Sequence, residues 1–320
     1  MAWGAVAGRS AELAGALGGQ ALCLYPPGGR RPSVPLRWTV SALRTVAHIL
    51  RHRPEVVVVT NPPLPAALVS WGAGRLVGAR VALDSHPGGF GAQGDRVAAR
   101  LQRTHRWLAR RVDVSIVAAP VWRELVEGWG GRAIVVHEAP GDWHPAPARR
   151  HQRLKVLYVG RFAGDEPWRA VLAAAAACPE IDVLVTGDPL GAGVAAGTLP
   201  SNVRLVGFLD APAYRQAVLG ADVVMSLTTE PGSIMRAACE AVWAGRPLVV
   251  SDWPAGREVF PYAVRTANDD RAIARALRRV DHRYDSLAAS APDALRLQLA
   301  RWKEQRRVLA EALNLELTLP

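Results

Sequence analysis

Ser233 and Glu240 are the first residues of this 320-residue sequence whose types and spacing point to ligand chemistry. An apolar run, residues 223–227, is followed by a Pro-Gly turn and by the helix-favouring residues 234–244. The pattern predicts a strand, a tight turn and a helix that starts near Ser233. The first amides of a helix have no acceptor within it, so they form a site for an anion such as phosphate.

Glu240 follows Ser233 by about two helical turns and is therefore expected on nearly the same face of the helix. Its carboxylate could accept hydrogen bonds from vicinal hydroxyl groups such as those of ribose. The alternative is a simple helix cap at Ser233 and an exposed glutamate. A second apolar run, residues 248–250, follows the helix. Strand, helix and strand units of this kind form parallel sheets, which bind ligands at the carboxyl ends of their strands.

The same segment resembles the donor-binding segment of the family 4 glycosyltransferases, which have the two-domain GT-B fold. The resemblance rests on Glu240 and on Ala241, Gly245, Pro247, Val249, Val250 and Glu258. It implies that Glu240 binds the nucleotide ribose, and that Gly232 stands where the family has a glutamate near the donor sugar. It also implies that the donor site is lined by Gly232, Ser233, Ile234 and Met235. The spacing further resembles a bacterial subgroup of such enzymes with unassigned substrates.

Two loops in the second half extend this resemblance. Gly160 and Arg161 follow the predicted strand 154–159, where the family has an arginine and, a few residues later, a lysine that neutralise the donor diphosphate. Arg161 matches the arginine, but the chain continues without the lysine. Gly207 and Phe208 lie in the predicted strand 202–209 and resemble the segment that lies against the donor base. The alternative role for Arg161 is a surface or interdomain salt bridge.

His86 is the candidate catalytic residue of the first half. It lies in a polar, glycine-rich segment, residues 84–91, directly after the predicted strand 80–83. Loops in that position are exposed, and small residues let a ligand approach. By position, His86 matches a family histidine that reaches the donor sugar, so the resemblance implies a catalytic role for His86 together with Arg161. The alternative is a loop histidine bonded to Asp84 or to the backbone.

The length allows two domains, and the alternation of strands and helices predicts an α/β protein with parallel sheets. The resemblance implies the GT-B arrangement of two Rossmann-like, doubly wound parallel-sheet domains facing a central cleft. We expect an acceptor-binding domain at residues 1–140, a linker at 141–152, a nucleotide-sugar domain at 153–290, and a C-terminal helix at 291–320 that crosses back to the first domain. Residues 20–25 predict a strand. The strand that ought to precede the first helix is almost absent, so the N-terminus is either reduced or incomplete.

Basic residues are concentrated in the first half, where residues 1–150 contain 19 Arg and 9 acidic residues. Many of them lie on two predicted amphipathic helices, residues 36–52 and 96–111. Such helices suggest an anionic membrane surface, or an anionic or lipid-linked acceptor. The alternative is that these are solvated helix faces. Nucleic-acid binding is not expected, because the sequence has no zinc spacing, recognition-helix motif or aromatic platform.

The cysteine content predicts a cytoplasmic protein, and the basic helices suggest a peripheral position on the inner membrane face. Its three cysteines are far apart and form neither a metal spacing nor a disulfide framework. No apolar run is long enough to span a bilayer, and no signal-peptide pattern is present. We expect no cofactor and no metal, the nucleotide sugar being a substrate.

These observations predict a glycosyltransferase that moves a sugar from a UDP or GDP donor to an acceptor hydroxyl. Family resemblance implies retention of the anomeric configuration. Two alternatives remain: a nucleotide-sugar epimerase of the same fold, and a non-catalytic binding or assembly protein. The sequence indicates neither the sugar, the acceptor, the linkage nor the oligomeric state.

Overall fold

The computed structural model describes residues 1–3, 8–24, 34–90, 96–145, 150–189, 193–194 and 199–317. The chain divides into two compact units. Unit 1 consists of Met1–Ala139 and Trp302–Pro320, and unit 2 consists of Pro140–Arg301. Each unit is built around its own parallel sheet.

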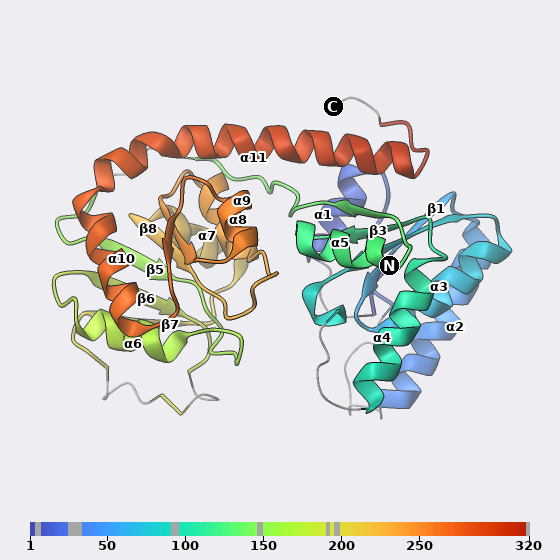
Figure 1. The fold of residues 1–320 in the computed structure, drawn as a ribbon, viewed down its shortest axis with the longest axis horizontal. Coiled ribbons are helices and arrows are strands. Elements are labelled where there is room, and N and C mark those ends of the chain that lie inside the picture. The colour runs from blue at the N-terminus through green and yellow to red at the C-terminus, as the bar shows by residue number, and fades with distance from the viewer. Residues whose placement is uncertain are drawn as a thin grey trace. The chain divides into compact units, whose positions relative to one another are not determined.

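Unit 1 contains a four-stranded parallel sheet with the order β1-β2-β3-β4 (Figure 1). Its strands are β1 (Val56–Asn61), β2 (Arg80–Ser85), β3 (Val114–Val117) and β4 (Ala133–Val135). The helices that alternate with them are α1 (Gly8–Ala16), α2 (Val34–His52), α3 (Leu64–Leu76), the short 3-10 helix η1 (Pro87–Gly89), α4 (Arg96–Ala109) and α5 (Pro120–Gly128).

The N-terminal residues extend this sheet by single pairings instead of a full strand. Ala2 forms an isolated parallel bridge with Cys23, so the strand predicted at residues 20–25 is wrong as a regular element over residues 20–24, and Tyr25 lies outside the described residues. On its other side the N-terminal stretch pairs with β1, because Thr60 N donates to Met1 O at 3.1 Å. Residues 1–3 therefore occupy the place where a strand before α1 is expected.

Unit 2 contains a six-stranded parallel sheet with the order β10-β9-β8-β5-β6-β7. Its strands are β5 (Lys155–Tyr158), β6 (Asp182–Thr186), β7 (Val203–Gly207), β8 (Val223–Ser226), β9 (Leu248–Ser251) and β10 (Val264–Thr266). Its helices are α6 (Trp168–Ala176), α7 (Ala211–Leu219), α8 (Arg236–Trp243), α9 (Pro254–Val259) and α10 (Asp270–His282). The first strand, β5, lies in the middle, and the chain builds the sheet outward on both sides of it, which is the doubly wound arrangement.

Helices cover both faces of each sheet, as the core clusters show. In unit 2 one cluster joins α6 and α10 to the sheet, and a second joins α7, α8 and α9 to the opposite face. In unit 1 one cluster contains side chains of α2, α3 and α4, and another contains Leu13 of α1 and Leu309 of the last helix. That helix is α11 (Tyr284–Ala312), which contributes residues to both units.

Candidate functional site

The carboxyl ends of β5 and β8 meet at the point where the strand order of unit 2 reverses. The two strands pair directly, with Tyr158 beside Met225. In an open parallel sheet, ligands bind in the crevice beyond the carboxyl ends of the strands at this topological switch point. Both predicted donor segments, residues 160–161 and 228–240, begin there.

Thr228 is the junction between these loops. Its hydroxyl donates to Asp165 O at 3.2 Å, and the amide of Thr229 donates to the same carbonyl at 2.8 Å. The carbonyl of Thr228 accepts two further hydrogen bonds at 2.8 Å, from the side chains of Trp253 and Asn268. The loop after β8 is therefore held by the loop after β5 and by two segments further along the chain.

Helix α8 begins later than predicted. It extends from Arg236 to Trp243 with Met235 as its N-cap, so the expected start near Ser233 is wrong by about one turn. The reason is a turn within the preceding segment, in which Ser233 N donates to Glu230 O at 3.1 Å. The predicted donor residues Gly232, Ser233, Ile234 and Met235 form the approach to the helix. Gly232 is buried and the other three are partly exposed.

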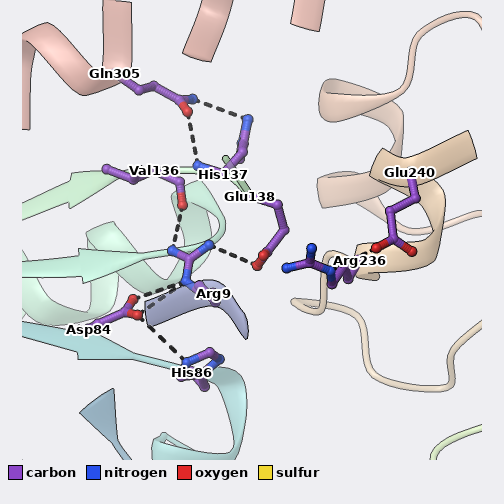
Figure 2. A network of polar contacts seen from close by, with 9 residues as sticks. All are labelled: Arg9, Asp84, His86, Val136, His137, Glu138, Arg236, Glu240 and Gln305. Carbon is purple, nitrogen blue, oxygen red and sulfur yellow. Dashed lines mark hydrogen bonds and ion pairs between the residues drawn. The ribbon is translucent and has the colours of Figure 1, made fainter. Parts of the chain in front are cut away.

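Glu240 lies on α8 with its carboxylate engaged by two side chains. Tyr214 of α7 donates its hydroxyl to Glu240 Oε2 at 2.6 Å, and Arg236 Nε donates to Glu240 Oε1 at 2.8 Å. Figure 2 shows the Arg236 pair, which spans one turn of the helix. The Glu240 side chain is 10% exposed, so it is neither the free surface glutamate of the alternative interpretation nor fully enclosed. Burial, and next the Glu240 charge, raise the pKa of Tyr214, which keeps the phenol a donor.

Arg161 lies in a loop that is organised by a buried carboxylate. Its own side chain is 73% exposed, and its Nε lies 3.6 Å from Glu166 Oε1. The Glu166 side chain is 1% exposed, and its Oε2 accepts hydrogen bonds from the amides of Arg161 at 2.7 Å and Ala163 at 3.3 Å. Glu166 thus determines the backbone shape that presents the Arg161 guanidinium to solvent at the carboxyl end of β5.

Gly160 and Gly187 lie where two loops of unit 2 approach too closely for a side chain. The Thr186 hydroxyl bonds both the amide and the carbonyl of Gly160 at 3.0 Å. Gly187 has φ +99°, and a Cβ placed on it would lie 2.6 Å from Gly160 O. Both glycines are therefore required by the packing of the loops after β5 and β6.

Gly207 and Phe208 lie at the end of β7, two strands from β5 in the same sheet. Gly207 has φ +72° and its carbonyl accepts a hydrogen bond from Gly187 N at 2.9 Å. The Phe208 side chain is almost fully exposed, at 88%. The Phe208 ring is therefore presented to solvent at this edge of the sheet.

In unit 1, His86 lies next to a buried network centred on Arg9. The His86 Nε2 atom lies 3.7 Å from Asp84 Oδ2, and the His86 side chain is 38% exposed. Figure 2 draws this pair. Asp84 in turn accepts from Arg9 Nε at 3.2 Å, and Arg9 also donates to Glu138 Oε1 at 2.8 Å and to Val136 O at 2.9 Å. Burial by itself lowers the pKa of Arg9, but the Asp84 and Glu138 carboxylates outweigh it and raise that pKa. The contact between His86 and Asp84 is the one that the alternative interpretation of His86 predicts.

His105 positions the loop that bears His86, although nothing in the sequence singled it out. Its Nδ1 lies 3.0 Å from Gly89 O, which makes Nδ1 the donor, and its Nε2 lies 3.2 Å from Asn61 Nδ2 and 3.1 Å from Ser85 Oγ. Burial lowers the pKa of His105 despite the hydrogen bond to Gly89, so the ring is neutral. His105 lies four residues after Leu101 and three before Leu108 on α4, so helical periodicity places it on the same side of the helix as these leucines. That periodicity was the only sequence signal for the position of His105.

The other residues that sequence reasoning missed are Tyr214, Arg236 and Glu166. Tyr214 lies in the middle of a short helix, and Arg236 lies one turn before Glu240. Neither position indicates a ligand site by itself, and only the fold brings both side chains to Glu240. Within the described ranges, no group of three or more His, Cys, Asp or Glu side chains is placed to hold a metal ion.

Comparisons with known proteins agree with this fold. The glycosyl transferase 4-like domain family matches residues 7–142. Comparison with curated protein sequences finds no significant match. Among solved structures, HepE from Anabaena in complex with UDP has a TM-score of 0.66 at 16% identity, covering 86% of this chain and 82% of that one. Sucrose-phosphate synthase from Thermosynechococcus elongatus has a TM-score of 0.72 at 15% identity, covering 91% and 82%.

A glycosyltransferase from Rickettsia africae is a further structural match, with a TM-score of 0.64 at 12% identity over 90% of this chain and 84% of that one. The two parallel sheets of four and six strands confirm the predicted α/β fold class, and the resemblance to family 4 is confirmed by the matched domain and by these structures. Residues 7–142 thus match the glycosyl transferase 4-like domain family, and the chain shares the GT-B fold of these solved structures.

Proposed function

We propose that the protein transfers a hexose from a nucleotide diphosphate donor, UDP or GDP, to a hydroxyl group of an acceptor. Unit 2 is proposed as the nucleotide-sugar domain and unit 1 as the acceptor domain. HepE, a structural relative, has been solved with UDP and with UDP-glucose, which favours UDP as the first donor to test.

The observation that carries this proposal is the oriented carboxylate of Glu240 at the switch point of the unit 2 sheet. Tyr214 and Arg236 each occupy one oxygen of the carboxylate. A carboxylate oxygen accepts more than one hydrogen bond, so each retains acceptor capacity for the vicinal hydroxyls of a ribose. Because two donors fix its orientation, the carboxylate is preorganised for such a pair.

The donor diphosphate is proposed to bind at the start of α8. The helix dipole and the first-turn amides favour a negative charge there, and Arg161 supplies a guanidinium from the neighbouring loop. Arg236, at the first position of α8, adds a second guanidinium in a chain that lacks the lysine of the family pattern. The same groups would stabilise the charge that develops on the leaving diphosphate, so this step requires no metal ion.

His86 is proposed to contact the transferred sugar, as the family resemblance implies, and Gly207 with Phe208 to lie against the base. Retention of configuration is proposed on the same basis, with the leaving diphosphate helping to take the acceptor proton. Gly160 is proposed to contribute because it has no side chain, which lets the backbone of its loop approach the donor closely. A lipid-linked or otherwise anionic acceptor is supported by the excess of arginine in residues 1–150.

The proposal is tested by measuring nucleotide binding and turnover in one series. Isothermal titration with UDP, GDP, ADP and TDP identifies the base, and Glu240→Gln is expected to weaken the preferred nucleotide by at least about tenfold, since it removes a charge-assisted hydrogen-bond acceptor. Glu180→Gln, which changes an exposed glutamate of unit 2 outside the donor segments, is the matched control and should bind normally. Equal affinities of both variants and the unmodified protein would refute the site.

Incubation of the protein with the nucleotide sugar alone separates the enzyme classes. Slow release of free sugar and nucleoside diphosphate supports a transferase without its acceptor. Formation of an epimerised nucleotide sugar supports the epimerase alternative. Tight nucleotide binding without any turnover, also after a panel of hydroxyl acceptors has been supplied, supports a binding protein.

A further inference from the structure

Helix α2 of unit 1 exposes its leucines to solvent. Leu36, Leu43 and Leu50 are spaced seven residues apart, about two helical turns, and therefore form one line along the helix. Their side chains are 55%, 67% and 45% exposed. Ala47, between the last two, is also exposed. Single exposed leucines are ordinary on protein surfaces, but a continuous apolar line along a helix marks an interaction site.

The face of α2 that is turned toward the protein is mixed, because Ala42, Val46 and Ile49 pack against the core beside two hydroxyl residues. Ser41 and Thr45 are 1% and 0% exposed, and Ile49 completes the buried line. The Ser41 hydroxyl donates to Leu24 O at 2.8 Å, and the Thr45 hydroxyl donates to Ser41 O at 2.7 Å and accepts from Trp3 Nε1 at 2.9 Å. The hydroxyls are thus satisfied, and the helix is fixed in an orientation that leaves three of its leucines exposed.

The exposed leucines are flanked by positive charge without any compensating acid. Arg44 and Arg51 each follow one leucine of the line and are exposed. The sequence contains no Asp or Glu between Glu12 and Glu55. An apolar line bordered by arginine is the composition of a helix that lies in the interface of a membrane, with leucines at the acyl boundary and cations at the headgroups.

The neighbouring helices extend this surface. Buried side chains of α2, α3 and α4 belong to one core cluster, so the three helices cover the same face of the unit 1 sheet (Figure 1). On α4, Leu101 and Trp107 are 48% and 39% exposed, and Arg111 lies over the Trp107 ring at 4.2 Å from its centroid. No helix in the described part of the chain is both long and apolar enough to cross a bilayer, and α2 itself is interrupted by arginines.

We propose that the line formed by Leu36, Leu43 and Leu50 docks on an anionic membrane surface, with Arg44 and Arg51 at the lipid phosphates. Charge decides between this occupant and a second copy of the chain. Two copies of the face would place arginine opposite arginine, whereas anionic lipid neutralises them. The inference goes beyond the proposed function, because docking needs neither nucleotide nor sugar.

The test is sedimentation of the full chain with phosphatidylcholine vesicles that contain or lack phosphatidylglycerol. We expect binding to the anionic vesicles, little binding to the neutral ones, and weakening of the former at high salt because screening shortens the reach of the charges. Equal pelleting with both kinds of vesicle, or with neither, overturns the proposal. This comparison of vesicles uses the unmodified protein, so it does not depend on whether a variant folds.

Two variants then locate the contact. Leu36→Ser with Leu43→Ser and Leu50→Ser is expected to weaken binding to anionic vesicles by at least about tenfold, and Arg44→Gln with Arg51→Gln by roughly fivefold for each arginine. Arg271→Gln with Arg275→Gln on α10 of unit 2 makes the same charge change at exposed positions and should bind like the unmodified protein. Equal loss in this control would show that only net charge matters and would refute the α2 surface.

Sedimentation equilibrium without vesicles tests whether the exposed leucines of α2 bind a second copy of the chain instead. A monomer at all concentrations supports the proposal, and a dimer that the leucine variant dissociates overturns it in favour of self-association. UDP affinity, measured on the same samples, reports separately on the donor site. Loss of vesicle binding with normal UDP affinity therefore concerns α2 alone.

Discussion

The Tyr214 hydroxyl donates a 2.6 Å hydrogen bond to Glu240 Oε2, and so joins α7 to the candidate ribose-binding carboxylate on α8. The two helices stand before and after β8, on the same face of the unit 2 sheet. Since Arg236 takes the other oxygen, the carboxylate has one orientation before any ligand arrives.

Replacement of Tyr214 by Phe is expected to weaken UDP binding about tenfold, the usual effect of removing a hydrogen bond to a charged group. Because burial and the Glu240 charge raise the pKa of Tyr214, the phenol stays protonated, so UDP affinity of the unmodified protein should not fall as the pH rises from about 7 to 9 through a change in this group. Titration calorimetry measures the UDP dissociation constant of Tyr214→Phe and the pH dependence of UDP binding by the unmodified protein. An unchanged dissociation constant for Tyr214→Phe would contradict the positioning role.

Replacement of Arg236 by Gln distinguishes two roles for its guanidinium. If Arg236 contacts the diphosphate, UDP affinity falls about tenfold or more while uridine affinity changes little, since a charge-assisted hydrogen bond is lost only in the first case. If Arg236 acts only by orienting Glu240, both affinities fall together. Arg257→Gln on α9 is the control, because its guanidinium pairs with the exposed Asp252. The ratio of the two dissociation constants is the readout.

Gly187→Ala is expected to lower the free energy of unfolding by about 1 to 3 kcal/mol, because a Cβ at φ +99° would also meet Gly160 O at 2.6 Å. The donor loops should shift with it and UDP affinity should drop. Gly72→Ala in α3 is the matched control: it has open space around the new Cβ and should stabilise the protein by about 0.5 to 1 kcal/mol. Urea unfolding of both variants checks the sign. Stabilisation by Gly187→Ala would show that the close approach is not real.

We expect the free energy of unfolding to fall in mild acid because of His105. Burial lowers its pKa from the ordinary 6.5, so the unfolded chain binds a proton more readily than the folded one. Stability from this group is complete above pH 6.5 and declines as the pH falls below 6.5 toward the lowered folded value. His105→Asn should be less stable at neutral pH but lose less on acidification between about pH 7 and pH 5. Melting temperatures against pH measure this, with exposed His144→Asn as the control, which should follow the unmodified curve.

Arg9→Met is expected to destabilise the protein by about 3 to 5 kcal/mol, because it removes the guanidinium that pairs with the buried Asp84 and with Glu138. Adding Asp84→Asn and Glu138→Gln to the same chain should recover most of that loss, since the remaining groups are neutral. Denaturant unfolding of the single and triple variants gives the comparison. An unchanged free energy of unfolding for Arg9→Met would mean that the network contributes little to the stability of the fold.

Most regular elements of the fold could be predicted from hydrophobic periodicity. The strand β2 and the helix α7 follow long or clearly bounded patterns, and Asp210, just before α7, caps it by accepting from Ala213 N at 2.9 Å. The region after Glu258 was missed. The strand β10 is only three residues long, whereas α10 does carry a local signal, because Asp269 caps it by accepting from Ala272 N at 2.8 Å. Short elements that depend on tertiary contacts leave little local signal.

The candidate site could be predicted only in part, since sequence shows which residues follow a strand but not which distant side chains contact them. Glu240 and Arg161 lie at the expected strand ends. Their partners Tyr214 and Glu166 come from the preceding helix and from a turn, and neither has a spacing that indicates the contact. The start of α8 was placed too early because Ile234 and Met235 favour helix while the turn before them is set by backbone hydrogen bonds.

The carbonyl of Thr228 is held by the side chains of Trp253 and Asn268, both from beyond the stretch that touches the proposed ligand. Substitutions in the connections around β9 and β10 can therefore tilt the loop after β8 and alter which donor is accepted. A mutational library aimed at changing specificity would do well to include these two remote positions alongside the residues that face the sugar nucleotide.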